Sequence, residues 1–520
     1  MVAAPHALAA AAGREVLAEG GNALEAMVAT AAAIAVAYPH MNHLGGDGFW
    51  LIRDPRGRVR YIEACGPAAV RAGIARYHDM GFDEIPTRGP HAALTVPGAV
   101  DGWRLALEAA RALGGRMSVA RLLEPAMRMA REGVPVSASQ ARLAAEKKGE
   151  LEGVPGFAAA FLPGGSVPAA GTLQRQSRLA DTFDHLSRAG LADFYKGDVG
   201  REIAADLDAM GSPVARADLA GYQALERPPL SVRLPEAQLF NAPPPTQGLA
   251  SLLILAAFRR LEPARAESFA HVHGLVEATK QAFRVRDSAV CDFDHVTQDM
   301  GALLAPEAVD RLAAAIDMRR AAPFGPGRPG GDTVWLGAAD ASGLVVSYIQ
   351  SIFFEFGSGC VLPGTGVLMQ NRGASFSLDP RALNALHPGR RPFHTLNPAL
   401  AVLRDGRVMA YGTMGGEGQP QTQAALFSRH VLYKVPLAEA IARPRWLLGR
   451  TWGQMETRLR LERRFDEELV ERLARAGHDP LVLDDDYSDI MGHAGAVILH
   501  ARGELEGAHD PRADGGAAGV

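Results

Sequence analysis

Thr333 follows Asp332 at the end of a run rich in proline and glycine, and a strand-like apolar pattern begins directly after it. A threonine hydroxyl is a poor nucleophile unless a base lies beside it. The α-amino group of the same residue, with a pKa of about 8, can be that base if the preceding peptide bond is cut. The step from Asp332 to Thr333 therefore suggests a self-cleaving residue, with an ordinary loop leading into a hairpin as the alternative.

A Gly-x-Gly-x-x-Gly pattern lies in the same run, at Gly325, Gly327 and Gly330, and has the spacing of a phosphate-binding loop. Such a loop follows a strand and opens a helix, whereas this one contains prolines and precedes a strand. We therefore interpret it as an exposed linker.

Motifs of other hydrolases and of metal sites are missing from the sequence. It has no Gly-x-Ser-x-Gly elbow and no His-Glu-x-x-His pair. Two close histidine pairs occur without a third ligand nearby, His40 with His43 and His271 with His273. We expect neither a metal ion nor a cofactor.

The amino-acid composition limits the kinds of ligand and the cellular location that we expect for this chain. The chain of 520 residues carries 54 Lys and Arg against 58 Asp and Glu, which gives no basic field for nucleic acid and favours a small ligand. Its alanine-rich start lacks a basic leader, and its most apolar long stretch, residues 23–37, is shorter than the roughly 20 residues of a membrane span. Three widely spaced cysteines (Cys65, Cys291 and Cys360) are expected to be reduced thiols. We expect a cytoplasmic protein without a membrane segment.

The elements that must position Thr333 can be predicted in outline. Gly20 and Gly21 end a first helix, and Asn22 with Glu25 forms a capping box that starts a second. A hairpin begins near Phe49, helical patterns dominate residues 71–320, and paired strand patterns return from Thr333 to the C-terminus. Blocks of strands and helices without a βαβ rhythm predict an α+β fold of antiparallel sheets covered by helices.

Many ordered segments carry a resemblance to a known family. They include "PHALAAAAGREVLAEGGNALEAMVA", "PHMNHLGGDGFW", "VPGAVDGW", "DFYKGDVG", "PPPTQG", "GDTVWLGAADASGLVVS", "FGSGCVLPGTGVLMQN", "RPFHTLNPAL", "GTMGG" and "GAHDPRADG". On these segments the chain resembles the γ-glutamyltranspeptidase family of N-terminal nucleophile hydrolases over nearly its full length. The resemblance implies a four-layer αββα sandwich with two antiparallel sheets.

The resemblance also implies roles for single residues. Thr333 is then both the self-cleaving residue and the nucleophile, which divides the chain into a large subunit, 1–332, and a small catalytic subunit, 333–520, that form a heterodimer. Ser351 stands where the family has a threonine that orients the nucleophile. Gly415 and Gly416 match paired glycines whose N–H groups form an oxyanion hole. Whether two heterodimers associate is left open.

The chain departs from the family where glutathione-handling members hold the glutamyl group. An expected arginine falls at Cys65, an expected acidic residue falls at Ser375, and an expected pair of serines is replaced by His394 and Thr395. An ammonium group would therefore lose its counter-charge, which is costly in a buried site. We expect γ-glutamyl substrates to bind poorly.

Two further departures favour a short acid. Arg372 replaces a neutral amide and can grip a carboxylate, together with His394 and Thr395, while Phe353 replaces an asparagine and fills space. A small carboxylate with a cleavable amide fits, and here the chain is most similar to family members that hydrolyse oxamate to oxalate and ammonia in purine breakdown.

Three alternatives stay open at this point. The chain can be a hydrolase or transpeptidase of glutathione and other γ-glutamyl amides, or an acylase for other side-chain amides such as those of cephalosporins. A third alternative, from a different class, is an uncut binding protein without catalytic activity.

Overall fold

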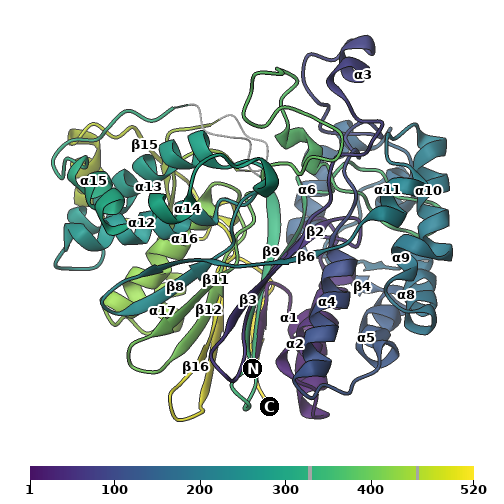
Figure 1. Ribbon diagram of the computed structural model, residues 1–520, viewed down its shortest axis with the longest axis horizontal. Coiled ribbons are helices and arrows are strands. Elements are labelled where there is room, and N and C mark those ends of the chain that lie inside the picture. The colour runs from purple at the N-terminus through teal and green to yellow at the C-terminus, as the bar shows by residue number, and fades with distance from the viewer. Residues whose placement is uncertain (326–330, 452–455) are drawn as a thin grey trace.

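The structure is a computed structural model that describes residues 1–325, 331–451 and 456–520, with Asp332 described in its main chain only. The linker interpretation of Gly327 and Gly330 therefore lies outside the described residues. Two sheets face each other and helices cover the outer face of each, so that the layers run helix, sheet, sheet, helix across the molecule (Figure 1). The predicted αββα sandwich is confirmed.

The first sheet has seven strands among the described residues, and every pair in it is antiparallel. Their order is β18 (Gly516–Ala518), β1 (Val2–Ala4), β9 (Asp332–Ala339), β10 (Val345–Phe353), β2 (Asp47–Arg53), β3 (Val59–Ala64) and β6 (Leu225–Arg227). The predicted hairpin near Phe49 is β2 and β3, and the predicted strand pair after Thr333 is β9 and β10.

The second sheet has six strands within the described ranges and is also antiparallel. Their order is β17 (Leu505–His509), β16 (Gly495–Leu499), β12 (Val408–Gly412), β11 (Ala399–Leu403), β8 (Ala237–Asn241) and β7 (Leu230–Arg233). Small sheets are formed by β13 (Trp446–Leu447), β14 (Leu459–Leu461) and β15 (Pro480–Val482), and by β4 (Val134–Pro135) with β5 (Leu173–Gln174).

Helices of the N-terminal part gather on the side of the first sheet (Figure 1). They are α1 (Ala7–Ala18), α2 (Ala23–Ala37), α3 (Ile74–Asp79), α4 (Ala99–Ala112), α5 (Val119–Glu132), α6 (Ala138–Leu151), α7 (Phe157–Phe161), α8 (Ser177–Ala189), α9 (Asp193–Lys196), α10 (Asp198–Met210) and α11 (Arg216–Gly221). The predicted capping box of Asn22 and Glu25 is present at the start of α2, whose side chains are all buried.

Helices on the side of the second sheet come from both halves of the chain (Figure 1). They are α12 (Gly248–Leu261), α13 (Phe269–Ala289), α14 (Met300–Leu303), α15 (Pro306–Ala314), α16 (Gly418–Phe427), α17 (Leu437–Ala442) and α18 (Glu467–Arg475). Among the described helices, none is both long and apolar enough to cross a bilayer.

One prediction about the elements was incomplete. Helices dominate residues 71–320 as predicted, but the short strands β4 and β5 and the sheet strands β6, β7 and β8 interrupt them. The strands β6 to β8 have three to five residues each, too few to establish a period of two against the surrounding helical pattern. Their pairing with β3 and β11 across long stretches of sequence provides the stability that the local pattern does not indicate.

The predicted division into two subunits at Thr333 passes through both sheets. Residues before it supply β1, β2, β3 and β6 of the first sheet and β7 and β8 of the second, and residues from β9 onward supply the rest. Each half therefore contributes strands to both sheets and side chains to the core between them. Two chains cut at this point would remain interleaved through main-chain hydrogen bonds.

Candidate active site

Three neighbouring strands bring Thr333, Ser351 and Asp47 to one end of the first sheet. In the strand register Ser351 lies opposite Asp47, and Val334 lies opposite Gln350. Side chains two residues apart on a strand share a face, and the corresponding neighbours belong to the core between the sheets. Those neighbours are Trp335, Ile349 and Phe49. The three polar side chains therefore face the space between the two sheets.

Thr333 is fully buried and directly follows Asp332 in β9. The Nε2 of Gln419 donates to its Oγ1 over 3.3 Å. On the next strand, the Ser351 Oγ accepts the main-chain N–H of Phe353 at 2.8 Å. Phe353 pairs with Asp332 across an irregularity in the ladder and has a φ of 81°, in the left-handed region that bulky residues rarely occupy. Strained backbone therefore lies opposite the predicted cleavage point.

Gly415 and Gly416 form the turn between β12 and α16. Their φ values of 113° and 55° suit glycine, since other residues are strained there. Neither main-chain N–H donates a hydrogen bond to another residue in the part of the chain that the structure describes. Gln419 follows this turn closely, in the first turn of α16, and its Nε2 donates to the Thr333 Oγ1. It therefore links the glycine turn to Thr333. Two unengaged N–H groups near a hydroxyl can stabilise a developing oxyanion.

A buried network fixes the glycine turn from the first half of the chain. Gln247, at the start of α12, donates its Nε2 to the carbonyl oxygens of Gly416 at 2.8 Å and Thr395 at 2.6 Å. Arg286 of α13 donates to the Gln247 Oε1 at 3.0 Å and to the Glu417 Oε1 at 2.6 Å. The Arg286 and Glu417 side chains are both fully buried, and the Nε of Arg286 also pairs with Asp287 at 2.8 Å. Removing Arg286 would therefore take a buried cation from two carboxylates.

Arg372 lies in a short 3-10 turn (Arg372–Ser375) and is 1% exposed. Its Nη1 is 3.5 Å from the Thr395 Oγ1, while its Nε and Nη2 have no hydrogen-bond partner among the described residues. The guanidinium carbon lies 3.9 Å from the centre of the Phe353 ring. Burial lowers the pKa of Arg372 to about 9, although nearby Asp47 opposes the shift. The side chain is thus a buried cation that no carboxylate of the described residues binds.

His394 and Asp47 lie beside this arginine. The Asp47 Oδ1 accepts the N–H groups of Gly66 and Gly98 at 3.3 and 3.0 Å, whereas its Oδ2 has no hydrogen bond to a described residue. Burial raises the pKa of Asp47 to about 7, with Arg372 acting in the opposite direction. Burial and, next, Arg372 lower the pKa of His394 far below its ordinary value, so its 3.6 Å contact with Asp47 involves a neutral imidazole and is not an ion pair.

All the site residues predicted from sequence lie in one connected cluster. They are Thr333, Ser351, Gly415, Gly416, Arg372, His394 and Thr395. Sequence reasoning missed Asp47, Gln247, Arg286 and Gln419. A signal existed for Asp47, which is an acidic residue at the start of an otherwise apolar strand. Arg286 and Gln419 lie in helices and Gln247 directly precedes one, and their partners are distant in sequence.

A second polar cluster has the residue types of a metal site. His273, Glu277 and His478 are buried, and their potential ligand atoms lie within 4.8 Å of one another. The Glu277 carboxylate is already bonded to the Lys280 ammonium at 2.7 Å and to the Ala322 N–H at 3.0 Å. The lysine therefore supplies the positive charge that this carboxylate needs.

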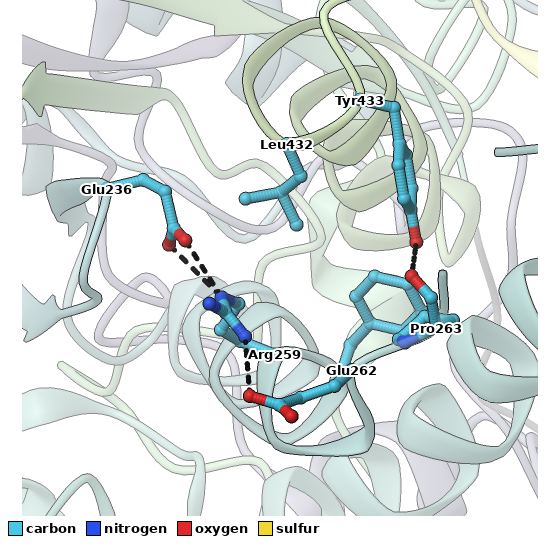
Figure 2. A pocket seen from close by; sticks show the side chains of 7 residues that line it. Glu236, Arg259, Glu262, Pro263, Leu432 and Tyr433 are labelled. Atoms are coloured by element: carbon cyan, nitrogen blue, oxygen red, sulfur yellow. Dashed lines mark hydrogen bonds and ion pairs between the residues drawn. The ribbon is translucent and has the colours of Figure 1, made fainter. Parts of the chain in front are cut away.

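A surface pocket of about 280 Å³ lies away from Thr333. It is at the C-terminal end of α12, whereas Gln247 is at the N-terminal end. Figure 2 shows Arg259 between the carboxylates of Glu236 and Glu262, and the Tyr433 hydroxyl directed at the Pro263 carbonyl oxygen. The charged groups of this pocket are thus paired with each other, unlike Arg372.

Known proteins are similar to this chain over its whole length. An oxamate amidohydrolase proenzyme from Klebsiella pneumoniae is 53% identical over 100% of this chain and 98% of that protein. A glutathione hydrolase-like proenzyme from Bacillus subtilis is 38% identical over 100% and 98%. The crystal structure of a cephalosporin acylase from Bacillus halodurans, 31% identical, superimposes with a TM-score of 0.91 over 100% of this chain and 95% of that one.

The family model described as gamma-glutamyltranspeptidase matches residues 9–520. With the sandwich fold and a relative more than half identical over its full length, this match confirms the resemblance noted in the sequence. The chain belongs to the γ-glutamyltranspeptidase family of N-terminal nucleophile hydrolases.

Proposed function

We propose that the chain cuts itself between Asp332 and Thr333 and then hydrolyses the amide of a small carboxylated substrate such as oxamate. In the mature enzyme the free Thr333 amine takes the proton of its own hydroxyl, and Oγ1 attacks the amide carbonyl carbon. The N–H groups of Gly415 and Gly416 stabilise the oxyanion. Ammonia leaves with a proton, and water then releases the acid from the acyl-enzyme.

The buried guanidinium of Arg372, whose Nε and Nη2 have no hydrogen-bond partner among the described residues, is the observation that carries the choice of substrate. A buried cation is costly unless an anion completes its bonding, and Nε with Nη2 offers the parallel donor pair that a carboxylate accepts. The Phe353 ring against the guanidinium limits the space beside it. Thr395 and the neutral His394 line the same position. A short acid therefore fits better than a long one.

The relatives support this choice. The Klebsiella protein, 53% identical, is named as an oxamate amidohydrolase proenzyme, and the word proenzyme agrees with self-cleavage. Both sheets contain strands from residues 1–332 and 333–520, so we expect the two subunits to stay together as a heterodimer.

Hydrolysis of a γ-glutamyl amide is the second candidate, because of one observation. The Asp47 Oδ2, which has no hydrogen bond to a described residue, is a carboxylate oxygen that the sequence analysis did not anticipate, and it can face the ammonium of an amino acid. Two features weaken this role. Burial raises the pKa of Asp47 to about 7, so the carboxyl is only partly ionised near neutral pH, and the cationic Arg372 beside it repels an ammonium group.

The decisive assay measures ammonia released from oxamate beside the colour released from a γ-glutamyl anilide. We expect turnover of oxamate and little of the anilide; the reverse preference would replace the proposed substrate with a γ-glutamyl group. Thr333→Ala is the matched inactive variant, expected to remain one 55.1 kDa chain without activity. Cleavage of that variant at the same bond would exclude Thr333 as the self-cleaving residue.

A further inference from the structure

Gln419 is buried in the first turn of α16, three residues after the Gly415–Gly416 turn. Its Nε2 donates to the Thr333 Oγ1 over 3.3 Å, and its Oε1 accepts the main-chain N–H of Asn397 over 3.2 Å. A main-chain N–H can only donate, which fixes the oxygen end of the amide on Asn397. The end of Gln419 that faces Thr333 is therefore a donor.

This donor constrains the proton of the Thr333 hydroxyl. A threonine hydroxyl has one proton to donate and two lone pairs that accept. Gln419 occupies one lone pair, so the proton must point to a different partner. In the cut chain the α-amine of Thr333 is an acceptor on the same residue, and the proposed mechanism requires the proton to move there.

We propose that Gln419 is a catalytic residue that orients the Thr333 hydroxyl and stabilises negative charge on Oγ1. The proposal rests on Thr333 being the nucleophile, as proposed above. A hydrogen bond to a charged oxygen is stronger than one to a neutral hydroxyl, so the contribution is larger in the transition state than in the resting enzyme.

The charge on Oγ1 arises in self-cleavage as well as in turnover. In self-cleavage a bond forms between Oγ1 and the Asp332 carbonyl carbon, the bond from that carbon to the Thr333 nitrogen breaks, and the hydroxyl proton goes to the nitrogen. Water then hydrolyses the resulting ester, which leaves an Asp332 carboxylate and restores the hydroxyl. In turnover the amide of the substrate replaces the peptide bond and ammonia carries the proton away. Gln419 contacts the same oxygen in every step.

A purely structural role is the competing explanation, and the same helix provides a comparison. Gln421 is equally buried in α16 and is bonded to the carbonyl oxygens of Glu417 and Leu448 and to the Leu448 N–H. It makes no contact with Thr333 among the described hydrogen bonds. Replacing Gln421 therefore removes buried amide bonds without removing a donor to Oγ1.

The experiment compares Gln419→Met with Gln421→Met. Freshly synthesised full-length chain is followed on denaturing gels for the rate of self-cleavage, and mature enzyme is assayed for kcat and KM with oxamate. We expect Gln419→Met to lower both the self-cleavage rate and kcat by about 10- to 100-fold, with KM changed less than about threefold. Gln421→Met should lower the melting temperature and leave both rates within about twofold.

The proposal is wrong if Gln419→Met keeps parental rates, or if Gln421→Met loses as much rate at equal stability. Should Gln419→Met fail to fold, Gln419→Glu is the second variant, because it keeps the size and removes the donor; parental rates in that variant would also overturn the proposal. If the parent cleaves itself but releases no ammonia from oxamate, the substrate proposal fails and the self-cleavage rates alone decide on Gln419. A parent whose short chain begins elsewhere than Thr333 refutes both.

Discussion

Arg372 and Arg512 are both buried, but their surroundings differ. Arg512 donates Nε and Nη2 to the two oxygens of Glu462, each over 2.6 Å, and Nη1 to Asp510 over 3.0 Å. Arg372 has one 3.5 Å contact to a neutral hydroxyl and two nitrogens without a described partner. One guanidinium is saturated by carboxylates of its own chain, and the other is not.

The pKa values of Arg512 and Arg372 reflect this difference in hydrogen bonding. Burial alone would lower the pKa of Arg512, but its bonds to Glu462 and Asp510 raise it above the ordinary value. For Arg372 burial prevails and the pKa falls to about 9. A saturated ion-pair network contributes to folding, whereas a buried cation held without its anion is expected where a ligand supplies that anion. The comparison thus separates a structural arginine from a binding one.

Loss of Arg512 should have the largest effect on stability. In the uncut Thr333→Ala background, Arg512→Met removes the bidentate partner of Glu462 and leaves Glu462 and Asp510 with one arginine each, Arg464 and Arg445. This loss should lower the free energy of unfolding by about 3 kcal/mol. Arg372→Met removes a cation without a bonded anion and should leave that free energy unchanged or higher. Urea unfolding followed by circular dichroism measures both. Equal losses in the two variants would remove the distinction between the two arginines.

For catalytic activity, in contrast to stability, loss of Arg372 should have the larger effect. In the cleaved enzyme, Arg372→Met should lower kcat/KM for oxamate by about 100-fold or more, mainly through KM, because the substrate carboxylate loses the buried cation proposed to bind it. Steady-state ammonia release gives the value. Parental kinetics on oxamate would show that Arg372 does not hold the substrate.

Asp47 should make the stability of the site depend on pH. Its pKa is raised from 3.8 to about 7 by burial, so the folded chain binds a proton that the unfolded chain has released between these values. Stability is then lost as the pH rises from about 4 to 7, and Asp47→Asn removes this loss. In the Thr333→Ala background, the stability of Asp47→Asn relative to its parent should increase by up to about 1.4 kcal/mol per pH unit in that window. A difference that stays constant or falls with pH contradicts the raised pKa.

The fold and part of the site could be predicted from the sequence. Capping residues, turn signals and alternating apolar strands are local, which explains why α1, α2 and the β2–β3 and β9–β10 hairpins were predicted correctly. The strands β6 to β8 were not, since they are too short to show a period and depend on partners far along the chain.

The site residues also divide into those that could be predicted from the sequence and those that could not. Thr333 was suggested by its position directly after a run of prolines and glycines, and its role and that of the Gly415–Gly416 turn were inferred from the resemblance to the family. Gln419 is one of several glutamines on α16, and only the folded chain shows which of them reaches Oγ1. The sequence shows an acidic residue, Asp47, at the start of the apolar strand β2. Its closeness to Arg372 and His394 depends on how separate segments pack in the folded chain.

Mass spectrometry of the mature, active protein tests the central claim most directly. The account predicts two chains, with the shorter one beginning at Thr333 and becoming heavier by one acyl group when the reaction is quenched during turnover. A single uncut chain with full activity, or a short chain whose first residue is not Thr333, would contradict it.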